Sequence, residues 1–209
     1  MTASFTPSCK SAPSRLLPQR SARRLAATLL ACVLLLCPCF ASAAEIDVKS
    51  AEIRAGDEAW LLDAEFGIDL GQRLQEVIAH GVALYFIAEC ELTSTRWYWI
   101  DEHVAGRKQT WRLAFNALTR QYRLSSGALF QSFDTLEEAL GVLSRLRDWK
   151  VADKGQLKPG ETYHAALRLK LDLTQLPKPF QVSALGSRDW NISAEIRRWS
   201  FVAARGVEK

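Results

Sequence analysis

Cysteine is scarce in this sequence beyond its first 40 residues. The chain has 209 residues and five cysteines, and four of these, Cys9, Cys32, Cys37 and Cys39, lie in its first 40 residues. Cys90 is therefore the only cysteine beyond that segment, which excludes an intrachain disulfide if the segment is removed. A chain of about 166 residues can bury roughly two-thirds of its unfolded surface, so we predict one domain without covalent cross-links at residues 44–209.

Acidic residues are missing from the first 43 residues, which carry five basic ones. An apolar run over residues 25–40 follows the bases, and small residues follow the run. This order is typical of a secretory signal peptide, and the run is shorter than the ~20 residues that span a membrane. We predict a signal peptide at residues 1–43, cleaved after Ala43 or Ala44, and a periplasmic protein. The alternative is an inner-membrane anchor formed by uncleaved residues 25–40.

A basic excess is also missing from the predicted mature domain. The whole chain has 27 basic and 23 acidic residues, but removal of the five leader bases leaves 22 against 23. Nucleic-acid-binding domains carry a clustered positive charge that neutralises phosphates. We therefore expect no nucleic-acid partner, and no stable membrane span after cleavage.

Sequence motifs of catalysis and cofactor binding are missing as well. Residues 44–209 contain no G-x-x-x-x-G-K-[ST], G-x-G-x-x-G or G-x-S-x-G motif. His80, His103 and His164 lie in different predicted elements without a second ligand at zinc spacing. Asp101 and His103 share one strand face, yet no nucleophile motif lies near them. We expect no cofactor, no metal site and no enzymatic activity.

Alternating apolar and polar residues predict strands over much of the domain. The clearest case is residues 163–173, and residues 82–95 place Cys90 on the core face. Breaks at Ala105-Gly106 and at residues 116–119 separate three of the strands. The predicted strands are residues 45–54, 58–69, 82–95, 96–104, 109–116, 120–125, 163–173 and 191–203. Short strands joined by short turns favour antiparallel pairing.

Two short helices complete the prediction. Asp69 is expected to cap a helix at residues 70–80, and Asp134 a second helix. The buried side of the second helix is expected to consist of Leu136, Leu140, Leu143 and either Leu146 or Arg147. Two prolines within residues 176–180 exclude a central strand there and favour an edge or a loop. The fold class predicted is mainly β: an antiparallel β-sandwich-like or α+β domain of about eight or nine strands with two short helices.

Tryptophan, in contrast, is abundant, since all seven tryptophans of the chain lie beyond residue 44. Most of them are expected to stabilise the core, because each buries ~150 to 250 Å². One or two could instead anchor a partner, since Trp, Tyr and Arg dominate binding hot spots. The candidate binding surface consists of Arg96, Trp97, Trp99, Asp101, His103, Trp111 and Arg112. Trp111 is predicted to pair across strands with the other two tryptophans, in an arrangement that could also stack on sugar rings.

Four segments together resemble an exported bacterial family catalogued as domain of unknown function 4390. They are residues 96–99, 109–113, 118–123 and 176–182, and the resemblance covers nearly all of residues 45–204. It implies an envelope protein of Gram-negative bacteria, often encoded near a membrane sensor kinase. It implies no reaction and no catalytic residues.

Three functional hypotheses follow. The leading one is a non-enzymatic periplasmic accessory domain that binds an envelope protein, such as the extracytoplasmic part of a membrane sensor kinase. The second is a cell-wall glycan binder or hydrolase that uses the Trp97 and Trp99 face with Asp101 as an acid, although hydrolysis needs a second carboxylate that the sequence does not supply. The third is a lipid carrier. The sequence does not specify an oligomeric state.

Overall fold

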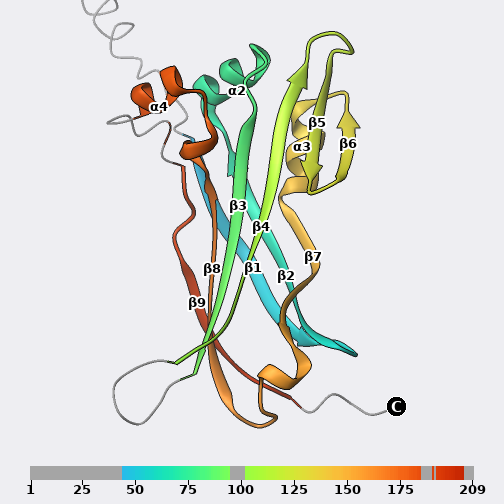
Figure 1. The fold of residues 1–209 in the computed structure, drawn as a ribbon, viewed down its shortest axis with the longest axis vertical. Coiled ribbons are helices and arrows are strands. Elements are labelled where there is room, and N and C mark those ends of the chain that lie inside the picture. Colours follow the sequence, from blue (N-terminus) through green and yellow to red (C-terminus); the bar gives the residue numbers. More distant parts are fainter. Residues whose placement is uncertain (1–43, 95–101, 185–189, 191, 205–209) are drawn as a thin grey trace, which may run out of the picture. The chain divides into compact units, whose positions relative to one another are not determined.

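The computed structural model of the chain describes residues 44–94, 102–184, 190 and 192–204, which belong to one compact unit, residues 41–209. This part of the chain forms nine strands in two antiparallel sheets, and a few short helices lie in the connections between strands (Figure 1). The predicted fold class, mainly β and antiparallel, is confirmed.

The smaller sheet has three strands in the order β1-β2-β7. Its strands are β1 (Glu45–Ala55), β2 (Ala59–Asp69) and β7 (Arg145–Asp153). β2 buries Trp60, Leu62, Ala64 and Phe66 on one side, as its period-two pattern predicts. This side contributes to a core shared with the larger sheet.

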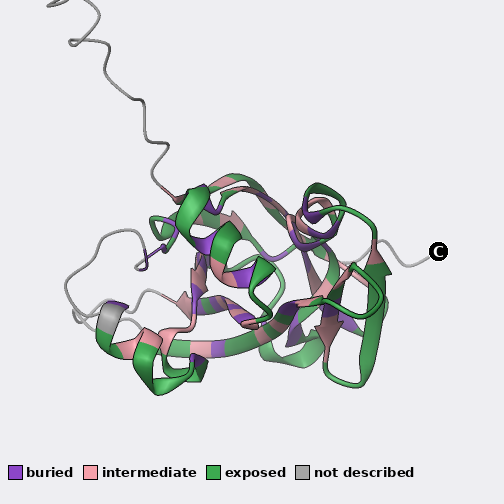
Figure 2. Ribbon diagram, turned by 90° about the horizontal axis from the view of Figure 1, so that it is seen from above, coloured by how far each residue is buried: buried purple, intermediate pink, exposed green. Residues whose placement is uncertain are grey.

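The larger sheet has six strands in the order β6-β5-β4-β3-β8-β9. Its strands are β3 (Leu84–Ser94), β4 (Glu102–Asn116), β5 (Gln121–Ser126), β6 (Leu129–Phe133), β8 (Thr162–Leu171) and β9 (Arg197–Val202). β3 lies in the middle, because it pairs with β4 on one side and β8 on the other. Along the central strands β3 and β8, buried residues alternate with partly or fully exposed ones, so one face of the sheet packs on the core and the other faces outward. Figure 2 colours the ribbon by this burial.

Two strands predicted at residues 96–104 and 109–116 are wrong as separate elements. Residues 102–116 form the single strand β4, and Ala105 and Gly106 lie inside it, opposite Leu92 and Glu91 of β3. The long neighbouring strand β3 provides hydrogen-bonding partners along the whole segment. Pairing with β3 thus overrides the weak local signal of a turn.

β6 and β7 were not predicted, and the last strand begins later than expected. β6 is exposed along almost its whole length, so it has no buried alternation to detect. β7 has register shifts against β2 that interrupt the period-two pattern. β9 begins at Arg197 rather than residue 191, although Ser193 makes an isolated bridge to Lys170.

Both predicted helices are present, and a third was missed. The second ends at Leu143, so the prediction that it includes Leu146 or Arg147 is wrong, because both lie on β7. α2 (Gly71–Ala79) ends before Gly81, which has a φ of +84°. α3 (Leu136–Leu143) is capped by Thr135 rather than Asp134, because the Thr135 hydroxyl oxygen accepts from the backbone N–H of Glu138 at 3.2 Å.

α4 (Lys178–Ala184) occupies part of the segment expected to be an edge or loop. Pro177 precedes this helix and Pro179 lies in its first turn, where a missing backbone N–H costs little. The carbonyl of Pro177 accepts from the N–H groups of Phe180 and Gln181 at 2.9 and 3.2 Å. The two short 3-10 helices are η1 (Lys154–Gln156) and η2 (Leu173–Gln175).

Candidate functional site

The candidate surface from the sequence is described only in part. Arg96, Trp97, Trp99 and Asp101 lie outside the described residues. The other three candidates, His103, Trp111 and Arg112, all lie on β4. The prediction placed Trp111 on a strand of its own beside the first tryptophans, whereas it shares a strand with His103.

His103 and Trp111 do not form one surface. They are eight residues apart on an extended strand, a separation of about 27 Å. A β-bulge also lies between them, because Leu92 pairs with Ala105 and Thr93 with His103, which leaves Val104 as an extra residue. The bulge reverses the alternation, so Trp111 lies on the core face and His103 on the outer face of the sheet.

Arg112 also lies on the outer face. Its Nε–H donates to the hydroxyl oxygen of Tyr85, its cross-strand partner, at 3.2 Å. Arg112 and Trp111 are consecutive in sequence but lie on opposite faces of the sheet. The side chain of Arg112 contacts Tyr85 of β3 instead of the tryptophan.

The outer face instead brings together two histidines from distant parts of the sequence. His103 of β4 and His164 of β8 both pair with Thr93 of β3, one on each side. Ser200 of β9 extends this row, because it pairs with His164. The sequence pattern placed His164 on the polar side of its strand, but it could not show which strands are neighbours.

A hollow of about 390 Å³ lies next to this row, over β3, β8 and the start of β9. Its lining includes Glu89, Glu91, Thr93, His164, Ala165, Ala166, Arg168, Ile196 and Arg198. The register explains the space: Glu91 pairs with Gly106 on one side and Ala166 on the other, and Ala166 pairs with Arg198. Two small residues therefore flank Glu91, and larger side chains surround them.

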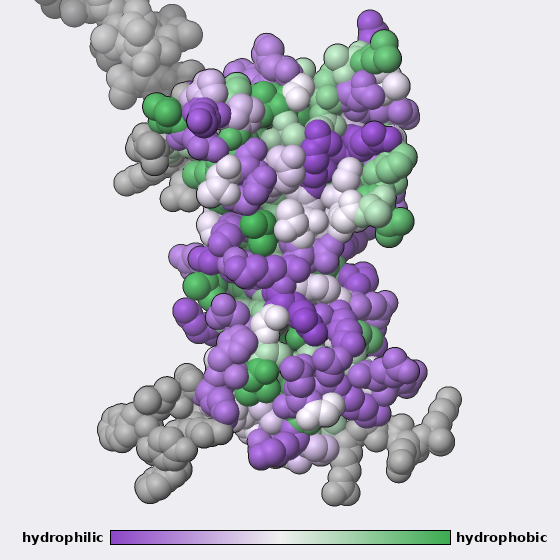
Figure 3. Space-filling view, viewed as in Figure 1, coloured by the Kyte–Doolittle hydropathy of each residue, from purple (hydrophilic) through white to green (hydrophobic). Residues whose placement is uncertain are grey.

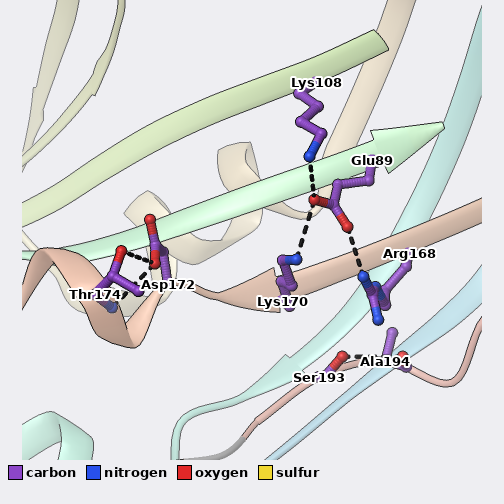
Figure 4. A network of polar contacts seen from close by, with 8 residues as sticks. All are labelled: Glu89, Lys108, Arg168, Lys170, Asp172, Thr174, Ser193 and Ala194. Atoms are coloured by element: carbon purple, nitrogen blue, oxygen red, sulfur yellow. Dashed lines mark hydrogen bonds and ion pairs between the residues drawn. The ribbon is translucent and has the colours of Figure 1, made fainter. Parts of the chain in front are cut away.

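A network of ion pairs includes Glu89 and Arg168, which line the hollow. Figure 4 shows the residues of this network. The carboxylate of Glu89 accepts from Arg168 Nη2 at 2.6 Å and pairs with the Nζ atoms of Lys108 and Lys170, each at 3.0 Å. The side chain of Glu89 is only 12% exposed. Burial alone would raise its pKa, but the hydrogen bonds from Arg168, Lys108 and Lys170 outweigh burial and lower the pKa to about 2. Glu89 is therefore ionised at neutral pH and connects three strands.

The charges that line the hollow are balanced. Two arginines, Arg168 and Arg198, line it together with two carboxylates, Glu89 and Glu91. Lys108 and Lys170 do not line the hollow and pair with Glu89. Glu89 is shared by Arg168, Lys108 and Lys170, whereas the side chain of Arg198 makes no hydrogen bond or ion pair with a described residue. The view in Figure 3 shows that hydrophilic side chains dominate the middle of the face it presents.

The described tryptophans are mainly part of the core. Trp60 and Trp190 are buried, and Trp111, Trp149 and Trp199 are half-buried and pack against the core. Their predicted placement in or against the core is confirmed, and their contribution to stability stays a prediction. Trp111 lies on the core face, so it does not join an exposed platform for sugar rings. For Trp97 and Trp99, the glycan hypothesis stays a prediction.

Cys90 lies in the core, as its strand pattern predicts, and is 1% exposed. Burial, with a smaller contribution from the nearby charge of Glu91, raises the pKa of the thiol to about 12. We expect the Cys90 peptide to remain unmodified when the folded chain is treated with iodoacetamide at pH 8. Peptide mass spectrometry checks this, with the urea-unfolded chain as the control that must be labelled. Modification of the folded chain at the rate of the unfolded one would contradict the buried position.

The edge strand β6 exposes large apolar side chains. Leu129 is 79% exposed and Phe130 58% exposed, and β5 is the only strand paired with β6 in the described residues. The segment from Leu129 to Phe133 contains no charge and no proline, the devices that usually protect an edge. The opposite edge, β9, carries Arg197 and Arg198.

The described residues contain no helix long and apolar enough to cross a membrane. Within the same residues, no group of three or more His, Cys, Asp or Glu side chains is placed to hold a metal ion. A family described as "Domain of unknown function (DUF4390)" matches residues 43–200. No curated protein and no solved structure gives a significant match.

Proposed function

The chain belongs to the DUF4390 family, a domain of unknown function, and we propose that it is an exported, non-enzymatic protein that binds a protein partner in the bacterial envelope. The partner surface we assign is the β6 edge, centred on Leu129 and Phe130. The observation that carries the proposal is the combination of exposed apolar side chains with an uncharged strand edge that pairs with none of the described strands except β5.

An edge of this kind suits strand addition by a partner. The outward backbone N–H and C=O groups of an edge strand can pair with an extended segment, and exposed side chains beside them supply specificity. Leu129 and Phe130 are consecutive on β6 and lie on opposite faces of the sheet, so an added strand covers part of each side chain. Full burial of a Leu or Phe side chain contributes about 1.5–3 kcal/mol, and partial cover of both contributes a smaller share of a micromolar affinity. Ordering of both chains on association offsets part of this gain.

A basic side chain lies beside Phe130. The guanidinium of Arg123, on β5, stacks over the ring of Phe130, with Cζ 3.8 Å from the ring centroid. Arginine and aromatic residues are typical of interface hot spots. This arrangement favours a partner strand that carries apolar residues and at least one acidic one.

The envelope location and the partner class rest on the sequence. The signal-peptide pattern of residues 1–43 supports export, and the family resemblance supports the extracytoplasmic part of a membrane sensor kinase as the first partner to test. The absence of catalytic motifs in the sequence supports a binding role.

The test is photo-crosslinking from defined positions of the full chain in envelope preparations. A photoreactive residue at position 129 is expected to crosslink the sensor's extracytoplasmic part, whereas one at Val202 is not. Val202 is the matched control, since it is 59% exposed on the opposite edge strand, β9.

Substitutions at the same edges give the quantitative result. The double variant Leu129→Asp with Phe130→Asp is expected to weaken partner binding at least tenfold, because charged side chains would have to be desolvated at the edge. Val202→Asp should leave binding within twofold. Equal crosslinking from both edges, or equal affinity of the two variants, would rule out the β6 edge as the binding surface.

A further inference from the structure

The hollow on the outer face lies away from the β6 edge. It is formed over β3, β8 and the start of β9, and strands β5 and β4 separate β6 from β3. Its volume of about 390 Å³ is in the range of pockets that hold small molecules. A ligand there would not compete directly with a protein bound at β6.

Two opposite charges face each other across the hollow without pairing. Glu91 and Arg198 are both cross-strand neighbours of Ala166, one on β3 and the other on β9. Their Cα atoms are two strand spacings apart, about 10 Å. Neither side chain forms an ion pair in the described structure, so the small side chain of Ala166 leaves a charged gap between them.

From this arrangement we propose that the hollow binds a zwitterionic small molecule, of the amino-acid or short-peptide class, across Ala166. The carboxylate of the ligand is held by Arg198, and its ammonium group is held by Glu91. A purely anionic ligand would be repelled by Glu91, and a purely cationic one by Arg198 and the neighbouring basic network. A zwitterion satisfies both sides, because each of its charges meets the opposite one.

The surrounding residues support both ends of such a ligand. The guanidinium of Arg168 forms an ion pair with Glu89, and Glu89 is also held by Lys108 and Lys170. These contacts fix the position of the Arg168 guanidinium in the wall of the hollow. His164 and Thr93 provide further hydrogen-bonding groups along one side. Ile196 provides an apolar wall, which suits a small alkyl side chain such as that of alanine.

The test is calorimetric titration of the full chain with three related dipeptides. The probe is alanyl-alanine, N-acetyl-alanyl-alanine lacks the ammonium charge, and alanyl-alanine amide lacks the carboxylate. Alanyl-alanine is expected to bind, and each blocked form should bind at least tenfold more weakly. Absence of alanyl-alanine binding at millimolar concentration would overturn the proposal. Equal binding of the acetylated form would also overturn it, in favour of a simple anion site.

Two variants locate the site without a large change in side-chain size. Arg198→Gln and Glu91→Gln are each expected to weaken alanyl-alanine binding at least tenfold. Arg147→Gln, an exposed arginine on β7 in the other sheet, is the matched control and should leave the affinity unchanged. If all three variants bind equally, the ligand lies elsewhere and the assignment to this hollow is wrong. Circular dichroism verifies that each variant is folded.

Discussion

Replacement of Trp190 by alanine is expected to lower the free energy of unfolding by about 3–5 kcal/mol, because loss of a buried indole leaves a cavity that its neighbours fill only partly. Trp190 is 1% exposed. Its ring lies 5.8 Å from that of Phe180 on α4, and the guanidinium of Arg73 on α2 lies over it at 5.7 Å. Trp190 therefore connects two helices with the core. Urea unfolding followed by circular dichroism measures the loss as a lower midpoint.

Two further variants separate packing from hydrogen bonding at this position. The indole N–H of Trp190 donates no hydrogen bond within the described structure. Trp190→Phe should therefore cost less, about 1–2 kcal/mol, because it retains an aromatic ring and removes no hydrogen bond. Leu118→Ala, at a residue that is 93% exposed, is the surface control and should change stability by less than about 0.5 kcal/mol. A Trp190→Ala variant as stable as this control would contradict the packing.

The second large effect is expected at Glu89. The change Glu89→Gln leaves the cations Lys108, Arg168 and Lys170 close together without their common counter-charge. We expect the free energy of unfolding at pH 7 to fall by about 1–3 kcal/mol, since the carboxylate is mostly buried while the lysines remain partly solvated. Glu58→Gln, at an exposed position in the β1–β2 turn, controls for the loss of one negative charge and should have little effect.

The same network predicts a pH dependence with a definite sign. The folded-state pKa of Glu89 is lowered from 4.5 to about 2. A lowered folded-state pKa means that the stabilisation is fully present above pH 4.5 and is lost as the pH falls toward 2. The stability difference between the wild type and Glu89→Gln should therefore shrink over this range, because protonated Glu89 resembles glutamine. Denaturant unfolding at several pH values checks it, and a difference that stays constant from pH 7 to pH 2 would contradict the network.

Local sequence patterns were sufficient for the parts of the fold with regular alternation. β3, β8 and residues 60–66 of β2 follow a period of two, so their buried faces could be predicted, including the position of Cys90. α3 was predicted from its apolar stripe, yet its cap was placed one residue early, because Asp134 and Thr135 are both good capping residues. Only the geometry shows that Thr135 accepts the hydrogen bond and that Asp134 accepts instead from Gln121.

Other elements depend on neighbours that are distant in the sequence. β4 continues through Gly106 because β3 pairs along its whole length, and β7 is held against β2 despite the irregular register. The bulge at Val104 then reverses the side on which His103 lies relative to Trp111. A missing or extra residue in a strand exchanges its faces, so no local pattern could have predicted this outcome.

The sequence by itself determined the single cysteine of the domain, the near-neutral charge of its predicted mature form, the family and the alternating strands, because these depend on composition and on neighbouring residues. Tertiary structure alone decided which strands are adjacent, since pairing of distant segments sets their order and register. That order places His164 beside Thr93, surrounds Glu89 with three cations, and puts Glu91 and Arg198 on either side of Ala166. Both proposed binding surfaces follow from this order, because it places β6 at the edge of the described sheet and forms the charged hollow over β3, β8 and β9.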